Sequence, residues 1–256
     1  MMCNYIKIVV KLKQKCKIMN EGETVELKVY QVKIKLYMLK DIPYEDVQSA
    51  ICRFIDMGFA KNTELLEFHN VNEFKNYCFD SLYPIEMDRV YKKDHIYTIT
   101  IRTIDKSLAK FFYEALANHY NKDFKGLTSE IKVIPKKRIE KLYCITPAIL
   151  KTEGGYWKNT MALDDFERRL KENLIKKYNT FMDEKIDEDF QLYKSIEFKN
   201  LKPIVAKYKN IKILGDKLNI YIDDDEISQK LAYMCLGTGV LEMNSRGLGF
   251  VNFKWL

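Results

Sequence analysis

Residues 32–57 read VKIKLYMLKDIPYEDVQSAICRFIDM, and the hydrophobic pattern changes its period within this stretch. Residues 32–38 alternate apolar and polar side chains, which is typical of a half-buried strand. Residues 44–57 then carry apolar side chains at helical spacing, and Pro43 suits the entrance of a helix. A strand followed by an amphipathic helix is therefore the first predicted unit.

The same reading extends along the chain in both halves. In the first half, a second helix is predicted around residues 108–116, and further strands at 77–82, 96–101 and 131–134. In the second half, the predicted elements are a broken strand, a helix, two strands, a helix and a final strand, at residues 142–149, 163–178, 195–198, 211–222, 227–235 and 248–253. Each half therefore has the order β-α-β-β-α-β.

This duplicated order predicts an α+β protein of two tandem ferredoxin-like modules with a C-terminal glycine-rich loop. We expect the modules to span residues 29–138 and 139–256. Residues 1–28 precede the pattern, either as an extra hairpin or as a segment upstream of the true start. Because this fold hosts many functions, it does not identify one by itself.

Composition narrows the class of partner. The chain has 256 residues and a formal net charge of +7, contributed mainly by Lys. A basic surface gains affinity for nucleic acid by releasing counterions from phosphates, although a Lys-rich solvated surface is the alternative. Six scattered cysteines without a C-x-x-C pair predict a reducing cytoplasm and no zinc site. The sequence has no run of about twenty apolar residues, so it predicts no membrane span.

Four of the ten glycines lie within thirteen residues of the C-terminal sequence GTGVLEMNSRGLGFV. They are Gly237, Gly239, Gly247 and Gly249. Asn244, Ser245 and Arg246 stand between them, and an Arg on a loop rich in backbone N–H groups is a natural phosphate cradle. A simple turn between a helix and a strand is the alternative. A dinucleotide site is less favoured, because the loop follows a helix and precedes a strand.

These paired Gly-hydrophobic-Gly elements, with Asn-Ser between them, resemble the signature of the CRISPR-associated pre-crRNA endoribonucleases, the sixth family of Cas proteins. The resemblance extends from about residue 29 to the end. It implies an enzyme that cleaves precursor CRISPR RNA within each repeat by attack of the 2′-hydroxyl, without metal or other cofactor. The implied partners are CRISPR repeat RNA and a CRISPR effector complex, for a monomer or homodimer in the cytoplasm.

Histidine is the natural acid or base near neutral pH, and the chain has three. His95 and His119 are better interpreted as solvated or helix-capping residues, whereas His69 follows the first helix. The resemblance implies that His69 is the general acid or base and that Lys75 is the cation that stabilises the phosphorane. The tyrosine that the family carries on the first helix is missing. Arg53 stands in the corresponding turn, where it could supply charge at the active site but could hardly act as a base.

Basic residues near the boundary between the modules predict a groove for the RNA backbone. They are Lys136, Lys137 and Arg138, together with Lys158. A solvated charged face is the alternative for these residues, and a non-catalytic RNA-binding protein of the same fold is the alternative function. A metal-dependent nuclease is not supported, because the acidic run at residues 223–226 is better interpreted as the entrance of the last helix.

Overall fold

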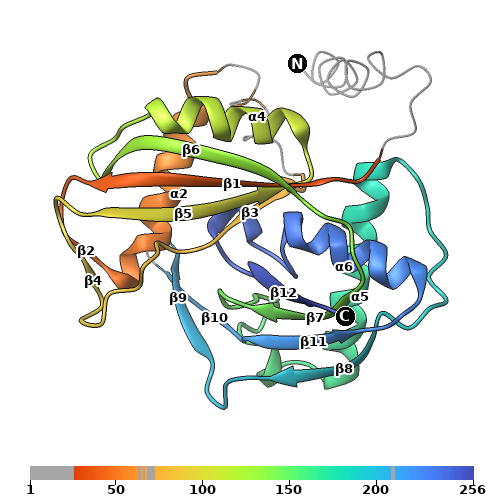
Figure 1. The fold of residues 1–256 in the computed structure, drawn as a ribbon. Helices are drawn as coiled ribbons and strands as arrows, with labels where there is room; N and C mark the ends of the chain where they lie inside the picture. Colours follow the sequence, from red (N-terminus) through yellow and green to blue (C-terminus); the bar gives the residue numbers. More distant parts are fainter. Residues whose placement is uncertain (1–25, 63–64, 66, 68–72, 209–210) are drawn as a thin grey trace, which may run out of the picture.

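The computed structural model describes residues 26–62, 65, 67, 73–208 and 211–256 (Figure 1). Predictions for residues 1–25 therefore lie outside the described residues. The described part is a mixed α/β fold built on two four-stranded antiparallel sheets, one from each half of the chain. Among the described helices, none is long and apolar enough to cross a membrane.

The N-terminal sheet has the strand order β3-β5-β1-β6. The elements of this half are β1 (Val29–Met38), α2 (Val47–Phe59), β3 (Tyr77–Phe79), β5 (Ile96–Thr103), α4 (Lys106–Ala115) and β6 (Phe124–Ile134), with β2 (Ile42–Pro43) and β4 (Val90–Tyr91) forming a separate short ribbon. Alternation in β1 sends Ile34 to the face where Phe54 of α2 and Phe112 of α4 pack against it. Both helices therefore cover one face of this sheet (Figure 1).

The C-terminal sheet has the order β12-β7-β11-β8. Its half contains β7 (Ile139–Cys144), α5 (Leu163–Met182), β8 (Tyr193–Phe198), β9 (Ile204–Tyr208), β10 (Ile211–Gly215), β11 (Leu218–Ile222), α6 (Glu226–Thr238) and β12 (Val251–Trp255). The acidic run does begin the last helix: the carboxylate of Asp225 accepts hydrogen bonds from the backbone N–H groups of Ile227 and Ser228 at 3.0 and 2.8 Å. Asp225 is therefore the N-cap of α6.

Three expected strands differ from the observed ones. The strand expected at 131–134 is the end of β6, which begins at Phe124 and is an edge strand, so its polar residues gave no alternating pattern. The strand expected at 142–149 is β7 and ends at Cys144, before Pro147. The strand expected at 211–222 is two strands, β10 and β11, and β9 pairs with β10 in a hairpin that was not predicted.

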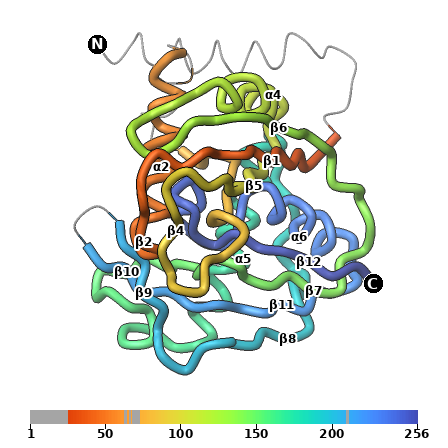
Figure 2. The backbone as a smooth tube through the Cα atoms, turned by 60° about the vertical axis from the view of Figure 1, so that its left-hand side comes forward, coloured from red at the N-terminus to blue at the C-terminus, as the bar shows by residue number. Residues whose placement is uncertain are grey.

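Helix α6 lies between the two sheets (Figure 2). Gly237 belongs to this helix rather than to a loop, and a Cβ there would lie 2.8 Å from Cγ2 of Ile104 in the N-terminal half. Arg102 of β5 is also buried at this junction and donates to the Val251 carbonyl oxygen of β12 at 2.7 Å. Leu27, expected to precede the fold, is buried in the core of the C-terminal half. The two halves therefore share one packed junction.

Candidate functional site

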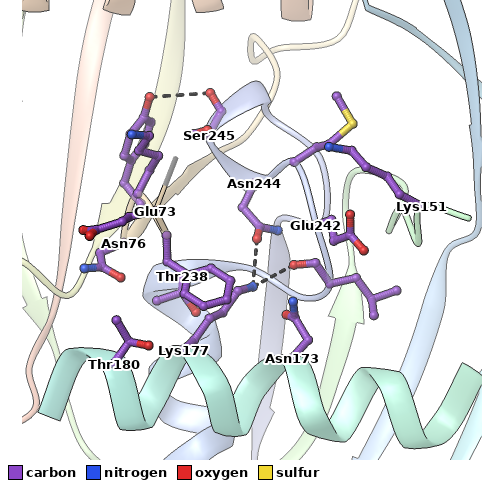
Figure 3. A pocket seen from close by; sticks show the side chains of 15 residues that line it. Glu73, Asn76, Lys151, Asn173, Lys177, Thr180, Thr238, Glu242, Asn244 and Ser245 are labelled. Atoms are coloured by element: carbon purple, nitrogen blue, oxygen red, sulfur yellow. Dashed lines mark hydrogen bonds between the residues drawn. The ribbon is translucent and has the colours of Figure 1, made fainter. Parts of the chain in front are cut away.

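A cavity of about 440 Å³ lies where four separate parts of the chain meet (Figure 3). Its walls come from residues 73–77, from Lys151, from α5, and from the end of α6 together with the segment that connects it to β12. Lys75, Asn244 and Ser245, all singled out from the sequence, line it. The structure therefore brings one predicted catalytic residue together with two residues of the predicted RNA-binding loop.

The glycine-rich loop runs from Gly239 to Gly249, because Gly237 lies within α6. A side chain at Gly249 is excluded twice over: its φ is +66°, and a Cβ would lie 2.2 Å from the Val240 carbonyl oxygen. The amide of Asn244 ties the loop together, since its Nδ2 donates to the carbonyl oxygens of Val240 and Leu248 at 2.9 and 3.0 Å. The loop is thus a closed, packed turn.

The loop is also docked on the N-terminal half. The hydroxyl of Tyr77 donates to the Ser245 carbonyl oxygen at 3.5 Å, and Nη1 of Arg246 donates to Oδ2 of Asp56 at 2.8 Å. Ser245 and Arg246 are half-buried, whereas Asn244 and the three glycines of the loop are buried. Arg246 therefore already has a carboxylate partner, Asp56, before any phosphate is bound.

Lys75 is half-buried at the edge of the cavity. Burial lowers the pKa of its ammonium, opposed by the nearby Glu73 carboxylate and reinforced by Arg246. His69, the predicted acid or base, lies outside the described residues. Lys75 is therefore the predicted catalytic residue that the structure places at the cavity.

The structure does not bring Arg53 to this cavity. Its guanidinium donates to Oδ2 of Asp123 at 2.8 and 3.3 Å, and Lys40 lies 2.6 Å from the other carboxylate oxygen. The side chain of Asp123 is fully buried, so these two cations compensate a buried negative charge. The structure therefore places Arg53, expected to supply charge at the active site, in this ion-pair cluster and not at the cavity.

The other two histidines differ from each other. His95 is exposed, with Nδ1 3.0 Å from the Lys93 carbonyl oxygen, as a solvated histidine would be. His119 is 2% exposed and packs against Phe54, with ring centroids 4.8 Å apart. Burial lowers the pKa of His119, with the Lys61 ammonium adding to the effect, so the ring is neutral at pH 7. His119 is therefore not solvated, but it does stand at the C-cap of the turn Leu116–Asn118 that ends α4, where its backbone N–H donates to the Leu116 carbonyl oxygen.

The predicted basic groove residues do not line the cavity. Lys136, Lys137 and Arg138 are exposed in the connection from β6 to β7. Lys158 lies in the C-terminal half, where its ammonium is 3.4 Å from Asp216 and 4.4 Å from the centroid of the Phe198 ring. These residues form separate surfaces rather than one cluster with the glycine-rich loop.

Sequence reasoning missed Lys177, which lines the cavity and is buried. Its Nζ donates to Oδ1 of Asn244 at 2.8 Å, as Figure 3 shows. A signal was present in the sequence, because Lys177 interrupts the apolar stripe of α5 beside Leu174 and Tyr178. In the described part of the chain, no group of three or more His, Cys, Asp or Glu side chains is arranged to hold a metal ion.

Comparison with known proteins agrees with this architecture. Residues 129–253 match the family model for CRISPR associated protein Cas6, C-terminal. The chain is 25% identical over 245 residues to the CRISPR-associated endoribonuclease Cas6 2 of Methanocaldococcus jannaschii, covering 87% of this chain and 98% of that protein. A solved structure described as "CRISPR associated protein Cas6" superposes with a TM-score of 0.63 at 23% identity, over 88% of this chain and 99% of that one.

A second solved structure, "An RAMP protein binding different RNA substrates", superposes with a TM-score of 0.65 at 18% identity, over 88% of this chain and 99% of that chain. The fold is thus similar to that of CRISPR-associated proteins, and the C-terminal half matches the family model of one of them. More specifically, residues 129–253 match the C-terminal part of the Cas6 family, and the chain is similar to a Cas6 endoribonuclease over most of its length, which confirms the resemblance noted in the sequence.

Proposed function

We propose that this protein is an endoribonuclease that cleaves precursor CRISPR RNA within its repeats to produce guide RNAs. The observation that carries the proposal is the shared cavity, where Lys75 faces the glycine-rich loop across the junction of the two halves. A positively charged side chain beside a turn with half-buried polar side chains such as Ser245 suits one phosphodiester of a bound RNA. The relationship to an endoribonuclease of the same family supports this reading.

The proposed chemistry uses the RNA's own 2′-hydroxyl. Its oxygen attacks the adjacent phosphorus, the bond from phosphorus to the 5′-oxygen breaks, and the products end in a 2′,3′-cyclic phosphate and a 5′-hydroxyl. One group must accept the 2′ proton and another must donate a proton to the leaving 5′-oxygen. We assign one of these roles to His69, six residues before Lys75, and stabilisation of the phosphorane charge to the Lys75 ammonium.

The proposed RNA path runs over the glycine-rich loop, with Ser245 and Arg246 at its accessible edge, and over the exposed Lys136, Lys137 and Arg138. We also propose that residues 29–138 and 139–256 are two ferredoxin-like modules. The element order and the two strand orders support this division. A CRISPR effector complex that takes up the cleaved RNA is the further partner we propose.

A non-catalytic protein that binds repeat RNA is the second candidate. The observation in its favour is the turn Cys52-Arg53-Phe54 of α2, which holds no tyrosine, and in which Arg53 is occupied by Asp123. Such a protein would bind the same RNA with the same loop and would leave it intact.

One assay separates the candidates and tests the mechanism. The purified protein is mixed in excess with an RNA copy of the host CRISPR repeat, in EDTA, beside the same RNA with a single 2′-deoxynucleotide at the cut site. We expect cleavage of the first RNA, and binding without cleavage of the second. Binding of both without any cleavage would favour the non-catalytic candidate. Activity lost in EDTA and restored by magnesium would contradict the proposed mechanism.

A further inference from the structure

Lys177 is a charged residue on the buried face of α5. The residue is 3% exposed and stands between the buried Leu174 and Tyr178. Its Nζ donates to the carbonyl oxygens of Gly239 and Leu241 at 2.9 and 2.8 Å, and to Oδ1 of Asn244 at 2.8 Å. An ammonium group has three N–H donors, so all three are used, and all three acceptors belong to the glycine-rich loop.

The three hydrogen bonds of this ammonium are with neutral groups. The titratable groups near it are Cys235 of α6, Cys78 of β3 and Glu242 of the loop, and the ionised form of each would raise the pKa of Lys177. Burial outweighs them and lowers the pKa of Lys177 to about 8, while it raises the pKa of the Cys78 thiol to about 12 and that of Cys235 further. Both thiols are therefore neutral near pH 7, and the charge is held by peptide and amide oxygens.

A lysine here is a poor choice for core packing alone. Burying an ammonium is unfavourable, and an apolar side chain of similar length would fill the same space without that cost. What the ammonium supplies is geometry: it draws together three oxygens from residues 239–244, which no apolar side chain would do. Asn244 passes this constraint on, because its Nδ2 donates to Val240 and Leu248 on the two sides of the loop.

We propose that Lys177 is a positioning residue, which holds the glycine-rich loop in the conformation that receives the RNA backbone opposite Lys75. The proposal rests on the proposed function, since it assigns to this loop the alignment of the scissile phosphate. Lys177 and Lys75 line the same cavity but have different parts in it. All three N–H donors of Lys177 bind the protein, so Lys177 acts through the loop, whereas Lys75 is proposed to contact the RNA itself.

The test compares Lys177→Met with Lys176→Met, a change at the adjacent residue of α5 that is exposed and paired with Glu172. Three quantities are measured: hydrogen exchange of the amides of residues 239–249 in the RNA-free protein, affinity for the repeat RNA, and the single-turnover cleavage rate. Lys177→Gln, which keeps a shorter neutral donor, serves as a second variant and gives the same comparison if Lys177→Met does not fold.

We expect Lys177→Met to speed loop exchange by about tenfold or more and to slow cleavage by roughly 10- to 100-fold, because small misplacements of reacting groups have effects of this size. Affinity should change by less than about threefold, because the Lys and Arg side chains on the surface remain. Lys176→Met should match wild type. Unchanged loop exchange, or a loss of affinity equal to the loss of rate, would overturn the proposal. If wild type cleaves no RNA, the proposed function fails, and loop exchange still decides the positioning role.

Discussion

The guanidinium of Arg246 lies 2.8 Å from the carboxylate of Asp56, and this ion pair joins the glycine-rich loop to helix α2. The two side chains are 24% and 32% exposed, between a surface pair and a buried one. A residue expected from the sequence to bind phosphate thus has a structural partner from the other half of the chain. The structural role of Arg246 and its proposed role in RNA binding can be separated, because the first needs Asp56 and the second does not.

The first prediction concerns this pair. Arg246→Ala should lower the free energy of unfolding by about 1–3 kcal/mol, between the values for exposed and buried pairs. It should also weaken repeat-RNA binding. The slope of the logarithm of the RNA-binding constant against the logarithm of the salt concentration should become shallower by about 0.7, the contribution of one phosphate contact. Asp56→Asn should lower the free energy of unfolding by a similar amount. Its affinity for the RNA should equal or exceed that of wild type, since the Arg246 guanidinium is released from its carboxylate partner. Equal affinity and salt slope for wild type and Arg246→Ala would assign Arg246 a structural role alone.

The second prediction concerns Gly247, whose φ is +79°. A Cβ there would lie 2.3 Å from Oε1 of Gln48 and 2.5 Å from the Phe79 ring. Gly155 is a matched control, with a φ of +93° and no atom within 4 Å of its Cβ position. Gly155→Val should lose about 1–2 kcal/mol through backbone strain, and Gly247→Val a further 1–3 kcal/mol or so through crowding.

Urea unfolding measures both losses, and a binding titration should show weaker RNA affinity for Gly247→Val but not for Gly155→Val. Equal loss of stability in the two variants would mean that the crowding at Gly247 is relieved at little cost. Unchanged RNA affinity in Gly247→Val would mean that the loop is merely a turn.

Much of this fold follows from local patterns. The alternation of β1 and the helical stripes of α2 and α5 are visible in the sequence, because each of these elements has one buried and one exposed face. Edge strands and hairpins carry no such contrast, so most of β6 and the β9–β10 hairpin were missed. Local periodicity predicts helices and strands that have one buried face, and it does not predict strands that lack this contrast.

The candidate site was predicted less completely, since its contacts join residues far apart in the chain. Arg246 and Asp56 are separated by 190 positions, and Lys177 and Asn244 by 67. A motif indicates that a residue is unusual but not which partner it has. Arg53 illustrates this: its place on α2 suggested catalysis, whereas its observed partner is Asp123, 70 positions away.

The third prediction concerns catalysis. His69→Ala should slow single-turnover cleavage by roughly 10²–10⁴-fold, the usual contribution of one positioned acid or base, with little change in RNA affinity. Lys75→Ala should also slow cleavage, by removing charge that matters most as the phosphorane forms. His95→Ala is the control, because His95 is exposed. His119→Ala is unsuitable as a control, since it would leave a hole beside Phe54. A wild-type rate for His69→Ala would move the active site elsewhere.

The fourth prediction follows from the buried charge of Lys177. Its pKa is about 8 in the folded protein and 10.5 in the unfolded chain, so between these values the unfolded chain binds more protons. The free energy of unfolding therefore rises with pH in this window. Lys177 loses its proton in the folded protein at a lower pH than in the unfolded chain, and the folded protein then no longer contains a buried ammonium. Below pH 8 the cost is fully present.

The measurement is the difference in free energy of unfolding between wild type and Lys177→Met, taken by urea titration at several pH values so that other titrating groups cancel. Between about pH 7 and pH 9.5, wild type should gain about 2 kcal/mol relative to the variant, as a proton is lost from the folded protein alone. Lys176→Met should show no such trend, because Lys176 is exposed in both states. A pH-independent difference for Lys177→Met would mean that Lys177 keeps its proton throughout, and the buried hydrogen bonds to Gly239, Leu241 and Asn244 would then hold the charge more strongly than burial opposes it.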